Sequence, residues 1–148
     1  MVAGASLLLV PGAAFADTPG HHPHYIHARG DLQEARSFLR GPLEPNVEAN
    51  LRSADGEIEA AIRELNRAAY ADAKDVHSRS IPDAHPDRIG RFRNLQKLLD
   101  RARKDLAAEE DNPNAMGWRD AAFKHIDAAL DFIHRAARDA HIDHELGW

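Results

Sequence analysis

The chain has 148 residues, of which 43% are hydrophobic and 29% charged, and it contains no cysteine. This length fits one domain with a substantial core better than two small domains. Without cysteine there can be no disulfides, thiolate metal sites, iron–sulfur clusters or covalent haem attachment. The net charge of −5 leaves no excess of positive charge to neutralise phosphates, so we expect no nucleic-acid partner.

The first 16 residues have the pattern of a bacterial export signal. An apolar run over residues 2–10 is followed by Pro11-Gly12 and by Ala14-Phe15-Ala16. An Ala-x-Ala motif after a short apolar run predicts cleavage after Ala16. The run is too short to span a bilayer, so we expect no integral membrane segment in the mature chain. We therefore predict a signal peptide at 1–16, a flexible His-rich leader at 17–22, and a periplasmic or secreted mature protein.

Four X-Pro dipeptides divide the rest of the chain: His22-Pro23, Glu44-Pro45, His85-Pro86 and Asn112-Pro113. Proline suits the first position of a helix, where its missing N–H would have no partner. After each dipeptide, apolar residues recur every three or four positions, as Leu51, Ala54, Ile58, Ile62 and Leu65 do. This is the period of a helix with one buried face. The pattern predicts helices over residues 23–40, 45–77, 86–110 and 113–144.

The predicted fold is all-α, an up-down-up-down four-helix bundle within residues 23–144. The first and third links are short, so the helices that they join should be antiparallel neighbours. This order brings together the start of helix one, the end of helix two, the start of helix three and the end of helix four. Asp72 and Arg88 lie on the apolar stripes of helices two and three, which predicts a buried Asp–Arg pair.

The predicted order also gathers histidines at one end of the bundle. Eight of the ten histidines fall toward this end: His21, His22, His24, His27, His77, His85, His141 and His144. Neutral imidazole is a good ligand for Zn, Cu and Ni. The pairs His24/His27 and His141/His144 each share one helix face because their members are three residues apart.

We therefore predict a site for a divalent transition metal (Zn, Cu or Ni), with the protein acting as a buffer or carrier. The preferred ligands are His24, His27, His134 and His141, followed by His21, His22, His144 and Asp131. Asp131 precedes His134 by three residues and could be a ligand or could fix the imidazole tautomer. Two alternatives stay open: the helix dipole alone favours His77, His141 and His144 near helix ends, and clustered histidines can make the protein pH-responsive.

No catalytic motif is present, and we expect no enzymatic activity. A ferritin-like di-iron site needs two Glu-x-x-His motifs, whereas this chain has only Asp131-x-x-His134. Glycines do not cluster into a phosphate loop, no serine has an elbow motif, and no inward ligand pair suits b-type haem, so we expect no nucleotide and no haem. The alternative function is a structural or interaction module of the cell envelope that binds an unidentified envelope protein. It rests on apolar residues outside the stripes: Ile26, Phe38, Phe132, Trp118 and Trp148.

The stretch His22-Pro23-His24-Tyr25-Ile26-His27-Ala28, followed by Asp31-Leu32 and Ala35-Arg36, resembles the opening of a group of small exported bacterial proteins of uncharacterised function. Residues 103–105 and 109–113 are similar to that group as well. The resemblance implies export and a helical bundle, and it implies no activity. The chain is also similar in kind to His-rich periplasmic metal-binding bundles. Those are repetitive and far richer in histidine, so high-capacity metal storage is not expected.

Overall fold

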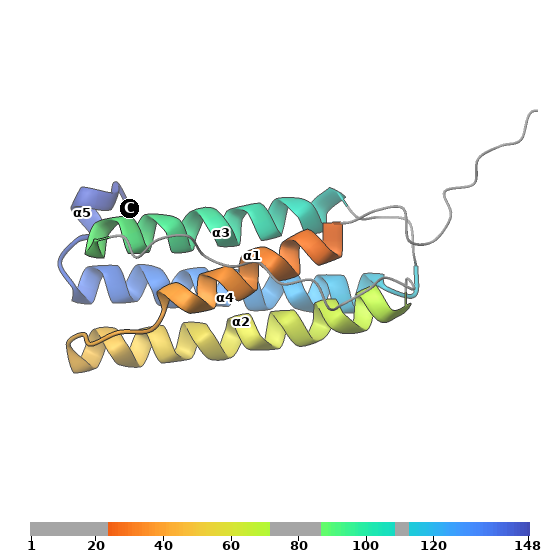
Figure 1. The fold of residues 1–148 in the computed structure, drawn as a ribbon, viewed down its shortest axis with the longest axis horizontal. Helices are drawn as coiled ribbons and strands as arrows, with labels where there is room; N and C mark the ends of the chain where they lie inside the picture. The colour runs from red at the N-terminus through yellow and green to blue at the C-terminus, as the bar shows by residue number, and fades with distance from the viewer. Residues whose placement is uncertain (1–23, 72–86, 109–112) are drawn as a thin grey trace, which may run out of the picture.

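The computed structural model of the protein describes residues 24–71, 87–108 and 113–148 (Figure 1). No strand occurs in these ranges, which form five helices: α1 (His24–Phe38), α2 (Pro45–Ala71), α3 (Arg88–Ala108), α4 (Met116–Asp139) and α5 (Asp143–Leu146). The predicted all-α class is confirmed. None of the described helices is long and apolar enough to cross a membrane. The predicted signal peptide and leader, and the link at 72–86 with His77 and His85, lie outside the described residues.

Each of the four long helices buries one stripe of aliphatic and small side chains. Leu51, Ala54, Ile58, Ile62 and Leu65 on α2 are all 9% exposed or less, as their spacing predicted. The largest fully buried side chains on the other helices are Leu32, Phe92, Leu95, Leu99, Leu106, Ile126 and Ile133. Alanines fill many of the remaining buried positions, and their small size lets the helices approach closely. Removing this apolar surface from water is the main favourable contribution to folding.

The fourth predicted helix, 113–144, is shorter than expected and is followed by a separate turn of helix. His141 has a φ of 54°, a left-handed conformation that ends α4. The His141 N–H donates to the Arg138 carbonyl and the Ile142 N–H to the Ala137 carbonyl, the paired bonds of a Schellman motif. Ile142 is 7% exposed, so the turn also buries an apolar side chain. This burial explains why a non-glycine residue is tolerated in the left-handed position.

The four long helices form a ring in which each neighbouring pair is antiparallel. The most extensive contacts join α2 to α4 and α1 to α3, and contacts of α1 with α2 and of α3 with α4 close the ring. Polar pairs indicate the directions. Asn50 near the start of α2 bonds to Asp139 at the end of α4 at 2.7 Å, and Arg36 near the end of α1 pairs with Asp55 in the first half of α2 at 2.6 Å. His24 at the start of α1 lies 3.7 Å from Asp105 near the end of α3.

The predicted up-down-up-down order is not confirmed. Arg88 at the start of α3 forms an ion pair with Glu44 just before α2, at 2.8 Å. Helices α2 and α3 therefore begin at the same end and run in the same direction on opposite corners of the ring (Figure 1). The order of directions is up-down-down-up. Asp72, the predicted partner of Arg88, lies outside the described residues.

The sequence prediction assumed that the link between α2 and α3 turns back at once. Residues 72–86, at about 3.3 Å each when extended, can reach about 50 Å. Helix α2 has 27 residues and is about 40 Å long at 1.5 Å per residue. The link is thus long enough to return the chain to the start of α2. Link length alone could not distinguish the two orders.

Candidate functional site

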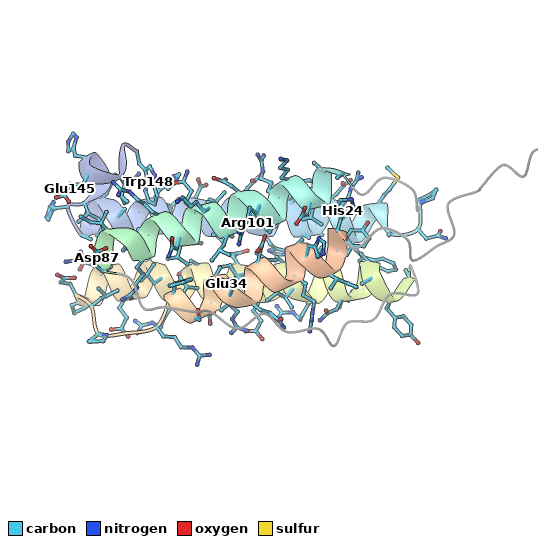
Figure 2. All side chains as sticks on the ribbon, turned by 45° about the horizontal axis from the view of Figure 1, so that its top comes forward. His24, Glu34, Asp87, Arg101, Glu145 and Trp148 are labelled. Carbon is cyan, nitrogen blue, oxygen red and sulfur yellow. The ribbon has the colours of Figure 1, made fainter. Side chains whose placement is uncertain are left out.

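Those predicted metal ligands that the structure describes lie at opposite ends of the bundle. His24 and His27 lie at the start of α1, where the His24 Nδ1 is 3.7 Å from the Asp105 Oδ1 near the end of α3. His134 lies at the other end, where its ring packs against Trp148 in a tilted arrangement. Figure 2 shows His24 at one end and Trp148 and Glu145 at the other.

This separation divides the described ligands of the predicted site into two groups. Trp148 also contacts Phe92, and the stretch of α3 from Phe92 to Asp105 is about 20 Å long at 1.5 Å per residue. Metal ligands must all lie within about 2–2.6 Å of one ion, so His24 and His27 cannot share an ion with His134. The described residues contain no group of three or more His, Cys, Asp or Glu side chains that could hold a metal.

The other predicted ligands do not complete a site in the described ranges. His141 and His144 are exposed at the end of α4 and in α5, and Asp131 is exposed on α4. His21 and His22 lie outside the described residues. Asp31, one turn beyond His27 on α1, is instead paired with a cation, because Arg101 binds it at 2.8 Å. Burial raises the pKa of Asp31 above its usual value, although the Arg101 charge opposes this shift.

His134 has a structural role in the described part of the chain. Its ring centroid is 4.5 Å from that of Trp148, and Trp148 also packs edge-on against Phe92 at 6.4 Å. The Arg93 side chain donates to the Glu145 carbonyl at 2.9 Å. These contacts hold the C-terminal turn on the start of α3. The His134 Nε2 is buried and makes no hydrogen bond to any described residue.

The sequence prediction missed an imidazole–carboxylate pair in the middle of the bundle. His125 Nδ1 on α4 lies 2.7 Å from Glu57 Oε2 on α2, and both side chains are about one-third exposed, at 36% and 31%. Helices two and four are diagonal in the predicted order, so this pair could not have been expected. The contact follows from the observed ring, in which α2 and α4 are the closest neighbours.

Aromatic side chains form a surface where α2 ends and α4 begins. A cavity of about 450 Å³ is lined by Asn66, Arg67, Tyr70, Ala71 and Trp118, which we call the Tyr70 surface. Tyr70 is 83% exposed, whereas most large apolar side chains of the described residues are buried. The sequence prediction named Trp118 but missed Tyr70, whose exposure no sequence pattern signalled.

The other apolar residues named from sequence contribute to the core. Phe38 is 6% exposed and belongs to the core, so its prediction as a surface residue is wrong. Phe132 and Trp148 are partly buried and pack against the core. Ile26 is half-buried on α1. Of the five, Trp118 lines the cavity of the Tyr70 surface.

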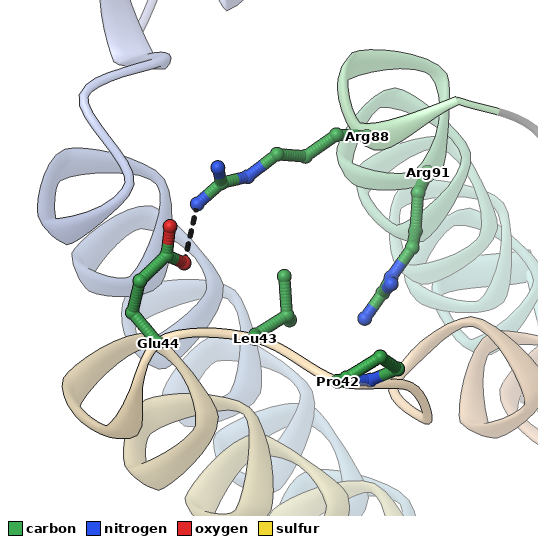
Figure 3. A pocket seen from close by; sticks show the side chains of 5 residues that line it. All are labelled: Pro42, Leu43, Glu44, Arg88 and Arg91. Atoms are coloured by element: carbon green, nitrogen blue, oxygen red, sulfur yellow. Dashed lines mark hydrogen bonds and ion pairs between the residues drawn. The ribbon is translucent and has the colours of Figure 1, made fainter.

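A second cavity lies at the opposite end, between the α1–α2 loop and the start of α3 (Figure 3). It has a volume of about 610 Å³ and is lined by Pro42, Leu43, Glu44, Arg88 and Arg91, which we call the Arg91 pocket. Glu44 pairs with Arg88, whereas Arg91 faces the loop and forms no ion pair with a described carboxylate. Nothing in the sequence marked this pocket, because its two walls meet only when α3 begins beside α2.

The comparisons with known proteins identify no relative. No protein-family model matches the chain, and neither the curated proteins nor the solved structures contain a match. The resemblance to small exported bacterial proteins therefore stays a prediction.

Proposed function

We propose that this protein is a non-enzymatic interaction module of the cell envelope that associates with a second copy of itself through the Tyr70 surface. The observation that supports this proposal is the 83% exposure of Tyr70 beside an apolar cavity. An exposed aromatic ring next to a recess is typical of interaction surfaces. We still expect the protein to be exported, and we propose self-association in place of metal binding as its main function.

The choice of a second copy as partner rests on self-complementarity. A two-fold symmetric interface uses the same patch on both subunits, so the patch must carry both a projecting group and a recess. The Tyr70 surface has both, because the Tyr70 ring projects while Trp118 and Ala71 line the recess. In a symmetric dimer, the Tyr70 ring of each copy can therefore insert into the recess of the other copy.

Charge does not oppose this association. Arg67 is the only charged residue among those that line the cavity, and it is paired with Glu64 at 2.8 Å. The rim is therefore close to neutral although the whole chain carries a net charge of −5. Two identical surfaces can approach without the repulsion that an unpaired charge would cause.

Sedimentation velocity of the wild-type chain in the presence of a chelator tests the proposal. We expect a dimer whose dissociation constant increases by at least about tenfold in Tyr70→Ser, because a central aromatic residue at an interface contributes about 2 kcal/mol or more. Lys97→Ser is the control, since Lys97 is exposed on α3 away from this surface. A wild-type monomer at all concentrations, or an equally strong dimer in Tyr70→Ser, would contradict the proposal.

A second candidate function is binding of Zn, Cu or Ni at the start of α1. It is supported by the His24–Asp105 pair at 3.7 Å, since a carboxylate beside an imidazole is common at metal sites. His27 is exposed one turn further along α1, and His21 and His22 precede it in the sequence. The remaining predicted ligands, at the other end, are not part of this smaller site.

Calorimetric titration with Zn²⁺, Cu²⁺ and Ni²⁺ tests this candidate with two matched double variants. We expect His24→Ala/His27→Ala to abolish binding and His141→Ala/His144→Ala to leave it unchanged. The second pair is the control because it has the same chemistry at the opposite end of the bundle. Wild-type affinity no tighter than millimolar, or equal losses in both variants, would rule out a metal site at the start of α1.

A further inference from the structure

We infer that the Arg91 pocket is a binding site for a small organic carboxylate, whose charged group pairs with the Arg91 guanidinium. The pocket is formed by two segments far apart in the sequence, the loop before α2 and the first turn of α3 (Figure 3). This inference is independent of the proposed self-association, because the Tyr70 surface lies at the other end of α2.

Arg91 is a partly buried cation without a counter-ion among the described residues. Its Nε and Nη2 are shielded from solvent and make no hydrogen bond to the described residues. Burial, together with the like charge of Arg88, lowers the pKa of Arg91 below its usual value. Leaving a charged donor buried and unsatisfied is costly, so such groups are rare unless they serve a ligand or another function.

The neighbouring Arg88, unlike Arg91, has a carboxylate partner. Arg88 Nη2 donates to Glu44 Oε2 at 2.8 Å, which ties the start of α3 to the loop. This ion pair neutralises Arg88 and leaves the charge of Arg91 unbalanced. Among the five residues that line the pocket, the net charge is therefore +1, which favours a monoanion.

The loop is shaped to bring backbone close to the Arg91 side chain. Gly41 has a φ of 134°, a conformation that residues with a Cβ rarely adopt. A Cβ at this position would lie 3.2 Å from the Arg91 Nη1, closer than most real Cβ contacts. Glycine thus permits both the turn and the position of the guanidinium against it.

The chemistry of the walls favours a carboxylate with an apolar body. The planar guanidinium matches a carboxylate in a two-point geometry. Pro42 and Leu43 offer apolar contacts to the rest of such a molecule, and about 610 Å³ is in the size range of small-molecule sites. The Glu44 carboxylate disfavours a multiply charged anion such as phosphate.

The first turn of α3 does not itself provide the anion site. The Gly90 N–H already donates to the Asp87 carboxylate at 2.7 Å, so this amide is occupied by a capping group. Binding should therefore depend on the Arg91 side chain. Replacing that side chain should remove binding while the helix remains capped.

Calorimetric titration with hexanoate, hexanamide and inorganic phosphate tests the inference. We expect hexanoate to bind the wild-type chain and Arg91→Gln to weaken this binding by at least about tenfold, because the charged pair is lost. Lys97→Gln removes an exposed positive charge from the same helix and should leave binding unchanged. Hexanamide should not bind, because it lacks the charge.

Thermal unfolding separates a binding role of Arg91 from a structural one. Hexanoate should raise the melting temperature of the wild type but not that of Arg91→Gln, since only a ligand bound to the native state stabilises it. Without hexanoate, Arg91→Gln should melt at the same or a higher temperature. Failure of hexanoate to bind, tighter binding of phosphate, or a lower melting temperature of unliganded Arg91→Gln would overturn the inference.

Discussion

Replacing Trp148 by alanine should destabilise the protein although the residue is only partly buried. Trp148 contacts the His134 ring at 4.5 Å and the Phe92 ring at 6.4 Å, and Phe92 is completely buried. Each aromatic contact of this kind contributes about 0.5–1.5 kcal/mol beyond the burial of area. Two such contacts, together with the apolar area lost from a partly buried indole, give an expected loss of about 2–3 kcal/mol.

Urea unfolding followed by circular dichroism measures this loss, and a double-mutant cycle assigns it. The His134→Ala and Trp148→Ala changes should be non-additive by about 0.5–1.5 kcal/mol because the two rings touch. Trp118→Ala, at the other end of the bundle, is the control and should show no coupling to His134. A Trp148→Ala protein as stable as the wild type would refute the docking of the C-terminal turn on α3.

Four further predictions concern single positions. Gly41→Ala should destabilise the protein by about 1–3 kcal/mol in thermal unfolding, because the φ of 134° at this position strains an L side chain. Gly56→Ala should instead stabilise α2 by about 0.5–1 kcal/mol, because a Cβ there would meet open space. Ile58→Ala should cost about 2–5 kcal/mol in urea unfolding because Ile58 is fully buried. The pKa of Asp31 is raised, so this carboxyl binds a proton more tightly in the native state than in the unfolded state. The free energy of unfolding should therefore fall as pH rises through that pKa. Unfolding curves of Asp31→Asn measured across this pH range should lack the fall.

The helices could be predicted from the sequence because each one is determined by local periodicity. Leu51, Ile58 and Leu65 recur at helical spacing, and all of them are buried. The end of the fourth helix could not be predicted in this way. It depends on a left-handed histidine, His141, at a position where glycine is usual, and on the tertiary burial of Ile142.

The candidate sites were less predictable because they depend on the order of the helices. The histidine site required His24 and His134 at one end, and this rested on α3 beginning near the end of α2. The ion pair of Arg88 with Glu44 shows the reverse arrangement. The same arrangement creates the Arg91 pocket and the His125–Glu57 contact, so these features could not be derived before the helix order was known.

Helices α2 and α3 begin at the same end of the bundle, and one distance tests this arrangement directly. The chain has no cysteine, so Ala71→Cys/Arg93→Cys can be spin-labelled specifically at two exposed sites near the end of α2 and the start of α3. Pulsed electron paramagnetic resonance should give a distance of about 35 Å between the two labels, because they are separated along the bundle axis by most of the length of α2. A separation of about 15 Å, as expected if α3 began beside the end of α2, would contradict the structure and restore the predicted clustering of histidines.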